Sequence, residues 1–322
     1  MTAAAPDLAA LRIAAVIPCY NEAAAIGQVI AGFRAALPQV QIHVFDNAST
    51  DDTAAVARAA GAEVTHVALR GKGNVVRRMF ADVEADVYVM VDGDATYDLA
   101  RLAEMIALLV DGNLDMVVGA RQDDRQDVQT YRPGHRLGNR LLTGTVAALF
   151  GGGFTDMLSG LRVFSRRYVK SFPALAQGFE TETELTVHAL ELRMPWTELP
   201  VRYLSRPEGS HSKLSTYRDG WRILLMITRL FVNERPLSFF STIAALLALA
   251  ALALAVPLVL TWLHTGLVPR LPTAVLATGM MLAGMLSAAC GAVLRTVTLG
   301  RREVKRLRYL AIPGVRYVLE RE

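Results

Sequence analysis

The sequence has little cysteine, few aromatic residues and no large excess of charge of either sign. Its two cysteines, Cys19 and Cys290, are widely separated and form neither a disulfide framework nor a metal-binding spacing, so we expect two buried thiols. Aromatic residues make up only 7% of the 322 positions, but 52% of the positions are hydrophobic. That share is sufficient for a folded core and excludes a largely disordered chain.

The small net charge argues against a nucleic-acid partner. The formal charge is +4, and the last 22 residues, with seven basic and three acidic side chains, account for all of it. A nucleic-acid-binding domain would instead spread basic residues over its folded surface.

The N-terminus also lacks a basic segment followed by an apolar one, so we expect no cleaved secretory signal and a cytoplasmic N-terminal domain.

Two long uncharged runs lie in the C-terminal third of the chain. Residues 239–263 carry no charge. The second expected helix, 272–296, is uncharged from Pro272 to Leu294, and Arg295 is its first charged residue. At about 1.5 Å per residue, each helix is long enough to cross a bilayer of about 30 Å. The linker carries only Arg270, whereas a cluster of five basic residues follows the second run at 301–308, which predicts that both termini are cytoplasmic. A soluble bundle with two buried helices is the alternative, although neither run has a polar face.

Two further segments combine basic and apolar residues at helical spacing. In residues 217–237, Arg218, Arg222 and Arg229 share one stripe beside apolar side chains, which is typical of a helix lying in a membrane surface. Residues 133–150 begin with basic side chains and then turn apolar. An ordinary amphipathic core helix is the alternative for each segment.

We therefore expect four parts in the chain. They are a folded domain at 1–216, the interfacial helix at 217–237, the two-helix hairpin at 238–299 and a basic cytoplasmic tail at 300–322. The second span also carries small residues at a spacing of four, namely Gly279, Ala283, Ser287 and Gly291. Either the first span or another subunit of a homo-oligomer can pack closely against such a stripe.

Apolar runs and helical patterns alternate over residues 10–122. The strand-like runs are 12–20, 42–46, 64–69, 87–94 and 115–120, and the helical patterns between them are 23–36, 52–60, 73–84 and 98–111. This alternation predicts an α/β fold with a mainly parallel sheet covered by helices on both faces. In such sheets, ligands bind at the carboxyl ends of the strands.

Acidic residues stand at three of those strand ends. Glu22 follows the first strand, Asp46 ends the second, and Asp92 and Asp94 flank Gly93 at the end of the fourth. Carboxylates gathered at one edge repel one another unless a cation lies among them, and a divalent cation with substrate phosphates is the usual partner. The alternative is local structure, because Asp-Gly is also a common turn and acidic residues cap helices.

The common nucleotide-binding fingerprints are missing. Gly71-Lys72-Gly73 lacks the third glycine of a dinucleotide-binding loop, and the sequence contains no G-x-x-x-x-G-K-[ST]. Instead, VIPCYNE, DNASTDDT, RGKGNVVRR and VDGDATYD occur in this order, followed by DMLSGLRVFSRR, FETETEL and SRPEGSHSKL. This set resembles the family 2 glycosyltransferases of the GT-A fold. Within that family it is most similar to the branch that transfers sugars to polyprenyl phosphates, and the likeness extends over residues 12–235.

The resemblance implies a donor site. It implies that the base and ribose of a nucleotide sugar are bound by Pro18, Tyr20, Glu22 and Asp46. Asp92 and Asp94, with Gly93 between them, would face the sugar and the metal–diphosphate, with Mg²⁺ or Mn²⁺ held by these carboxylates and most directly by Asp94. Glu182 would reach the sugar, and Arg206 and Lys213 would lie on a loop that closes over the diphosphate.

The resemblance also implies an acceptor phosphate near Arg121, for which a solvated strand-end charge is the alternative. A lipid phosphomonoester, with a second pKa of about 6, is already an anion at pH 7, so the reaction requires no strong base. Asp156 is therefore a candidate for either a base or an orienting carboxylate. Simple core ion pairing is the alternative for Asp156, and Arg162, six residues on, would pair with Asp156 or with phosphate.

Together, these features predict an inverting transfer of one sugar from a nucleotide sugar, UDP-linked rather than GDP-linked, to undecaprenyl or a related polyprenyl phosphate. The product would serve a cell-envelope glycan or lipid modification. A processive polysaccharide synthase is one alternative, although the Q-x-x-R-W sequence that such enzymes usually carry is missing. A membrane subunit that binds nucleotide sugars without turnover is the other.

Overall fold

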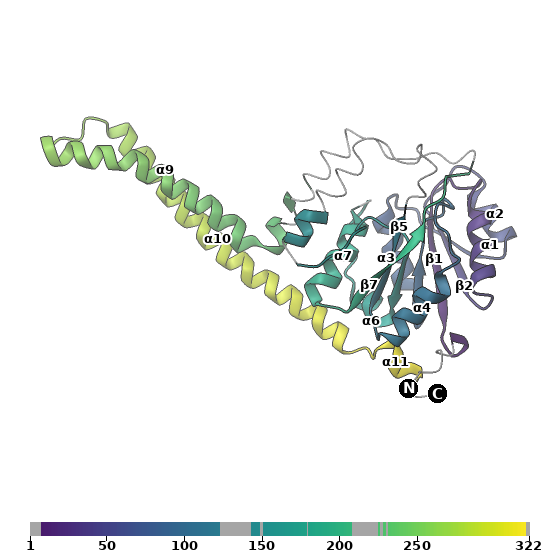
Figure 1. Cartoon of the computed structure of the whole chain (residues 1–322). Helices are drawn as coiled ribbons and strands as arrows, with labels where there is room; N and C mark the ends of the chain where they lie inside the picture. The colour runs from purple at the N-terminus through teal and green to yellow at the C-terminus, as the bar shows by residue number, and fades with distance from the viewer. Residues whose placement is uncertain are drawn as a thin grey trace. The chain divides into compact units, whose positions relative to one another are not determined.

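The computed structural model describes residues 8–122, 143–148, 151–178, 180–207, 225, 228–229 and 231–319. Seven strands form one mixed sheet in the order β3-β2-β1-β4-β6-β5-β7 (Figure 1). They are β1 (Ile13–Cys19), β2 (Gln41–Asp46), β3 (Glu63–His66), β4 (Val87–Met90), β5 (Met116–Gln122), β6 (Arg162–Ser165) and β7 (Trp196–Arg202). β6 is antiparallel to its neighbours β4 and β5, and the other pairs are parallel.

Helices cover both faces of this sheet. After the short 3-10 turn η1 (Leu8–Ala10), they are α1 (Ile26–Ala36), α2 (Thr53–Ala59), α3 (Lys72–Asp82), α4 (Leu102–Asp111), α6 (Arg166–Ser171) and α7 (Thr181–Leu192). Ile13, Ala15 and Ile17 of β1 belong to a core cluster with α1 and α4, whereas Ala14 and Val16 belong to a cluster with α3, α6 and α7. Because the strand is buried on both faces, its sequence is apolar throughout.

The predicted α/β fold is confirmed. The five expected strands and four expected helices are present with shifts of a few residues at their ends. β6 and β7 were not predicted. They complete the half of the sheet beyond β4, and β5 joins the sheet by pairing with both of them.

The turns at the carboxyl edge of the sheet have unusual backbone conformations. Asn21 after β1, Ala48 after β2 and Ala95 after β4 have φ angles of 53°, 54° and 54°. A residue with a Cβ rarely adopts this left-handed region, and such positions cluster at functional sites. Each of the three lies within two residues of an acidic residue expected in the site.

Contacts divide the chain into two compact units, one of Met1–Trp221 with Val304–Glu322 and the other of Arg222–Glu303. We expected residues 300–322 to form a separate tail, but part of that segment packs in the first unit. Lys305 pairs with Glu191 at 2.7 Å, and the Tyr309 hydroxyl donates to Asp115 at 2.8 Å. Val315 of α11 (Val315–Leu319) is buried in the cluster that contains α4.

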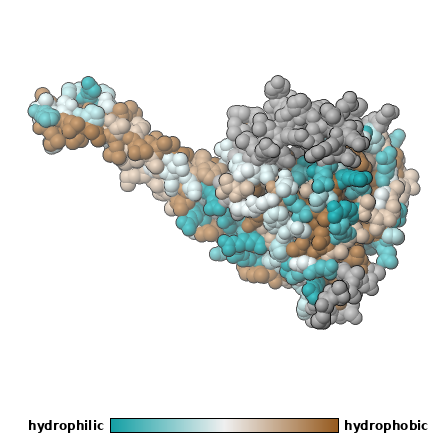
Figure 2. All heavy atoms as spheres, viewed as in Figure 1, coloured by the Kyte–Doolittle hydropathy of each residue, from teal (hydrophilic) through white to brown (hydrophobic). Residues whose placement is uncertain are grey.

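The second unit contains the long helix α9 (Pro236–Thr265) and the part of α10 (Leu271–Leu310) that ends at Glu303. Both are long and apolar enough to be candidate membrane spans, and only 6% and 17% of their most apolar windows are buried. Figure 2 shows the apolar surface along this hairpin. That exposure contradicts the alternative of two buried helices in a soluble bundle. It also corrects the expectation for the cysteines, because Cys19 is buried but Cys290 on α10 is exposed.

The contact between α9 and α10 uses small residues of α10 at a spacing of seven. Its buried residues are Ala277, Gly284, Gly291 and Thr298. At Gly291 an added Cβ would lie 2.9 Å from the Cβ of Phe240, so the backbones approach closely there. Of the stripe expected from the sequence, Ser287 and Gly291 contact α9, whereas Gly279 and Ala283 are exposed.

Candidate functional site

Asp94 lies beyond the carboxyl end of β4 and is almost completely buried, with 6% of its surface exposed. Its Oδ1 accepts a hydrogen bond from the Thr96 hydroxyl at 2.7 Å, and its Oδ2 accepts one from Arg206 Nη2 at 2.6 Å. Burial and the neighbouring carboxylate of Asp92 raise the pKa of Asp94, although Thr96 and Arg206 oppose that shift. The structure therefore brings the two expected donor-site residues Asp94 and Arg206 into contact.

Asp92 and Glu182 share one cation, Lys72. Lys72 Nζ donates to Asp92 Oδ1 at 2.5 Å and also to Glu182 Oε1. Burial alone would lower the pKa of Lys72, but the two carboxylates outweigh burial and raise it. We did not assign Lys72 a role from the sequence, although it lies in the RGKGN motif. The second oxygen of Glu182, Oε2, is buried and accepts no hydrogen bond from the described residues.

Two glycines allow the chain to pass close to this acidic group. A Cβ at Gly160 would lie 2.3 Å from Asp92 Oδ2, so only a glycine leaves space for that carboxylate. A Cβ at Gly93 would lie 2.5 Å from the Cys19 sulfur, which places the turn after β4 against the end of β1. The expected site residue Gly93 thus has a steric reason to be glycine.

The ends of β1 and β2 lie beside each other, because Pro18 pairs with Phe45 and Cys19 with Asp46 in the parallel ladder. Asp46 is buried, and its Oδ2 lies 3.3 Å from Nδ1 of His66. The guanidinium of Arg70 lies 5.2 Å from the centre of the Tyr20 ring. Glu22 is also buried. The four expected base and ribose residues therefore gather at one end of two neighbouring strands.

Asn47 holds the loop that carries Arg70 and Lys72. Its amide nitrogen donates to the carbonyl oxygens of Val67 and Leu69, at 3.1 and 2.7 Å, and its amide oxygen accepts from the Gly71 N–H at 2.7 Å. A buried amide with these bonds is a rigid connection between β2 and the loop after β3. Sequence reasoning missed this residue, although DNAST contains it.

Arg121 at the end of β5 forms a two-point ion pair with Asp156. Arg121 Nε donates to Oδ2 at 2.6 Å and Nη2 donates to Oδ1 at 2.7 Å, and both side chains are about nine-tenths buried. The Tyr203 ring lies 5.4 Å from the guanidinium carbon. Burial opposes ionisation of Asp156, but Arg121 outweighs burial and holds the pKa of Asp156 below its ordinary value. Asp156 is therefore a poor proton acceptor at neutral pH.

Arg162 has a different environment from the one expected. Its side chain is fully buried, and its guanidinium donates to the carbonyl oxygens of Ser159 at 3.0 Å and Met157 at 2.5 Å and to the Thr186 hydroxyl at 3.0 Å. Burial lowers the pKa of Arg162. The expectation that Arg162 pairs with Asp156 or binds phosphate is wrong, because β6 lies inside the sheet between β4 and β5 and carries the side chain into the core.

Several expected residues lie outside the described part of the chain. Lys213, most of the helix predicted at 217–237 and most of the basic-to-apolar segment at 133–150 belong to this group. Their assignments stay predictions from the sequence.

The described residues suit a Mg²⁺ or Mn²⁺ ion that is bound together with a diphosphate. They contain no group of three or more His, Cys, Asp or Glu side chains that could hold a metal alone. Magnesium usually binds through one or two carboxylates together with substrate phosphates and water. Asp92 and Asp94 are two carboxylates of the kind that such an ion would use, and both oxygens of Asp94 accept hydrogen bonds, from Thr96 and from Arg206.

The mixed sheet and the acidic edge beside β4 define the class as a GT-A glycosyltransferase. The family model for glycosyl transferase family 2 matches residues 14–172. Glycosyltransferase AglJ of Haloferax volcanii is 34% identical over 251 residues, which cover 76% of this chain and 80% of that protein. The chain belongs to glycosyl transferase family 2, as its motifs predicted.

Two further similarities bear on the chemistry of the site. A dolichyl-phosphate hexose transferase of Haloferax volcanii is 27% identical over 224 residues, covering 69% of this chain and 95% of that protein. The crystal structure of glucosyl-3-phosphoglycerate synthase from Mycobacterium tuberculosis in complex with Mn²⁺ and UDP-glucose superimposes with a TM-score of 0.56 at 25% identity. The match covers 69% of this chain and 79% of that one.

Proposed function

We propose that this glycosyltransferase transfers one sugar from a nucleotide sugar, UDP-linked rather than GDP-linked, to a polyprenyl phosphate such as undecaprenyl phosphate, with inversion at the anomeric carbon. The observation that carries the proposal is that the Asp94–Arg206 pair and the Arg121–Asp156 pair both lie at the edge where β4 and β5 end, in a chain with two candidate membrane spans. A hexose transferase named for dolichyl phosphate among the relatives supports this acceptor class.

The donor half of the mechanism uses the edge beside β4. Asp92 and Asp94 would hold Mg²⁺ or Mn²⁺, which when bound neutralises the diphosphate as it leaves. Arg206 would also stabilise the charge of the leaving diphosphate, because its guanidinium lies beside Asp94, where the metal and the diphosphate would bind. The buried Oε2 of Glu182, which has no hydrogen-bond partner among the described residues, is an acceptor for a sugar hydroxyl, and Lys72 holds the other oxygen of that carboxylate.

The acceptor half uses Arg121. A phosphomonoester is already an anion at pH 7, so attack requires that the phosphate be oriented rather than deprotonated. The lowered pKa of Asp156 agrees with this, because Asp156 would remain an anion that orients the Arg121 guanidinium. We therefore assign Asp156 the orienting role rather than that of a base. A lipid acceptor also accounts for the two apolar helices, which would anchor the enzyme as a multi-pass protein of the cytoplasmic membrane with its catalytic unit and both termini in the cytoplasm.

Transfer from a panel of radiolabelled UDP- and GDP-sugars tests the proposal. The full chain, purified in detergent with Mn²⁺ or Mg²⁺, is expected to move label into the organic phase when undecaprenyl phosphate is present. The matched acceptor without phosphate, undecaprenol, is expected to accept no label. The configuration of the product, read by NMR of its anomeric proton, is expected to be opposite to that of the donor.

Asp94→Asn is the matched inactive variant, since it preserves size and removes a metal-binding charge. Long water-soluble polymer as the labelled product would support a processive synthase instead. Nucleotide-sugar binding without transfer to undecaprenyl phosphate, to dolichyl phosphates or to water would support a non-catalytic subunit. Transfer to phosphoglycerate but not to lipid would refute the acceptor that we propose.

A further inference from the structure

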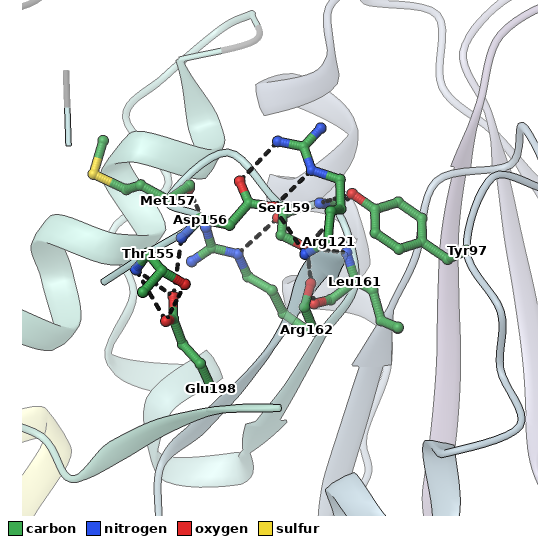
Figure 3. Close-up of polar contacts among 11 residues, drawn as sticks. Tyr97, Arg121, Thr155, Asp156, Met157, Ser159, Leu161, Arg162 and Glu198 are labelled. Atoms are coloured by element: carbon green, nitrogen blue, oxygen red, sulfur yellow. Dashed lines mark hydrogen bonds and ion pairs between the residues drawn. The ribbon is translucent and has the colours of Figure 1, made fainter. Parts of the chain in front are cut away.

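Glu198, in the middle of β7, belongs to none of the motifs that we used to locate the site. It nevertheless binds the backbone of Asp156, the ion-pair partner of Arg121. Its carboxylate accepts hydrogen bonds from the Thr155 N–H at 2.9 Å and from the Thr155 hydroxyl at 2.7 Å. It also accepts the N–H of Asp156 at 3.2 Å. Figure 3 shows Glu198 below this segment and the Asp156 carboxylate directed to Arg121 above it. One side chain thus holds two consecutive residues of a loop.

The pairing of β5 with β7 fixes Glu198 three positions along the ladder from Arg121. β5 and β7 are parallel neighbours, with Val118 opposite Glu198 and Arg121 opposite Val201. The same ladder therefore carries Glu198, which binds the backbone N–H of Asp156, and Arg121, which binds the Asp156 carboxylate. Because the strands cannot slide without breaking this ladder, Asp156 is held between two fixed points.

The far end of the loop is held separately. Arg162 binds the carbonyl oxygens of Met157 and Ser159, and the Ser159 hydroxyl donates to the carbonyl oxygen of Gly119 on β5 at 2.6 Å (Figure 3). Residues 155–161 have few backbone hydrogen bonds of their own, so these side-chain bonds determine where Asp156 lies. Glu198 is the member of this set that contacts Asp156 itself.

We infer that Glu198 is a positioning residue for the acceptor phosphate: it holds the backbone of Thr155 and Asp156, and thereby sets the carboxylate that orients the Arg121 guanidinium. An arginine held at two points by a carboxylate presents its plane in one orientation, and that orientation selects the direction from which a phosphate approaches. This inference rests on the proposed function, in which Arg121 receives the acceptor. It adds a residue that acts through Asp156 without touching substrate.

Steady-state kinetics of Glu198→Ala, Glu198→Gln and the control Glu104→Ala test the inference. Glu104 is exposed on α4 and pairs only locally, with Arg101, among the described contacts. We expect Glu198→Ala to raise KM for the polyprenyl phosphate by about tenfold or more, because a small displacement of an orienting group has a large effect on the reaction. Its KM for the nucleotide sugar and its affinity for UDP with Mn²⁺, measured by calorimetry, are expected to change by less than about twofold. Glu198→Gln, which keeps one acceptor oxygen, is expected to lie between Glu198→Ala and wild type.

A double-mutant cycle separates positioning from general stability. If Glu198 acts through Asp156, then Glu198→Ala is expected to change the acceptor KM by less than about twofold in an Asp156→Asn background. Should Glu198→Ala fail to fold, Thr155→Val removes one of the bonds to Glu198 and keeps the backbone ones, and it is expected to show a smaller rise in acceptor KM with donor KM unchanged.

An unchanged acceptor KM in folded Glu198→Ala or Thr155→Val, an equal rise in donor KM, or additive effects in the cycle would overturn the inference. These outcomes differ from failure of the proposed function. If wild type labels the lipid but the variants do not raise the acceptor KM while leaving the donor KM unchanged, only the role of Glu198 is refuted. If wild type itself labels no lipid, the acceptor class is refuted first.

Discussion

Arg206 and Asp94 form an ion pair at 2.6 Å, in which the Asp94 side chain is 8% exposed and that of Arg206 is 30% exposed. The carboxylate proposed to hold the metal is therefore neutralised by a cation of the chain itself. A metal ion that arrives alone must compete with Arg206 for Asp94. A metal that arrives with a diphosphate offers Arg206 a phosphate in exchange, so donor and metal binding are expected to be coupled.

Removal of Arg206 is expected to change metal affinity in opposite directions with and without nucleotide. Without nucleotide, Arg206→Gln should bind Mn²⁺ about fivefold more tightly, because a partly exposed pair contributes about 1 kcal/mol. With UDP present, the variant should bind Mn²⁺ more weakly than wild type. Electron paramagnetic resonance of free Mn²⁺ measures both values. Arg101→Gln, which removes a surface ion pair, is the control. Weaker Mn²⁺ binding by Arg206→Gln without nucleotide would contradict the idea that Arg206 and the metal compete for Asp94.

Loss of the cation between Asp92 and Glu182 is expected to destabilise the catalytic unit. Lys72→Met leaves two adjacent carboxylates without their shared partner, and the cost of breaking such a buried pair is about 3 kcal/mol. The double variant Lys72→Met/Glu182→Gln removes one of the two charges and should recover part of the melting temperature. Scanning fluorimetry of wild type and the three variants, including Glu182→Gln alone, measures this. If the double variant melts below Lys72→Met, repulsion between the carboxylates is not the cause.

A methyl group at Gly160 is expected to displace Asp92. The added Cβ would lie 2.3 Å from Asp92 Oδ2 and 2.8 Å from its Cγ, so that side chain must move from its position beside Lys72. Such a displacement of a group in the site can lower kcat/KM by about 100-fold. Gly153→Ala is the matched control, because no atom of the described residues, apart from the chain neighbours of Gly153, lies within 4 Å of its added Cβ. Equal activity of the two variants in the transfer assay would show that Asp92 tolerates the change.

His188 on α7 is expected to make the stability of the catalytic unit sensitive to acid. Burial lowers the pKa of His188 to about 3, with Lys305 adding to the shift. The unfolded chain binds a proton near pH 6.5 and the folded chain does not, so the free energy of unfolding falls by about 1.4 kcal/mol per pH unit as the pH drops from 6.5 towards 3. His188→Gln removes this contribution of His188 to the pH dependence of the free energy of unfolding.

The advantage of wild type over His188→Gln should therefore be smaller by about 2 kcal/mol at pH 5 than at pH 7.5. Unfolding in urea at both pH values measures this difference. His264→Gln, at an exposed position of α9, is the control. A difference between wild type and His188→Gln that is independent of pH would mean that His188 is charged or solvated in the folded state.

The strand-end carboxylates could be predicted because two local signals coincide. Asp92 and Asp94 follow an apolar run, and parallel strands end at a common edge, so their proximity to Asp46 and Glu22 follows from the pattern alone. The partner of each carboxylate could not be predicted in this way. Lys72 is 20 residues from Asp92 and 110 from Glu182, and Arg206 is 112 from Asp94, so these pairs depend on how distant loops return to the edge.

Arg162 shows where the pattern misled. An arginine shortly after a Ser-Gly turn has the chemistry of a phosphate ligand, but β6 runs antiparallel inside the sheet and carries its side chain into the core. Glu198 shows the reverse case. A glutamate in an alternating strand has the pattern of a solvated face, and only the register of β5 and β7 brings it under Asp156.

The sequence by itself determined the fold class, the acidic edge after β4 and the two long apolar helices, because periodicity and local composition record which faces are buried. Tertiary structure alone decided which cation neutralises each carboxylate, which arginine faces the site and which is enclosed in the core. Those outcomes depend on sheet order and register, which bring together residues a hundred positions apart and leave no local trace in the chain.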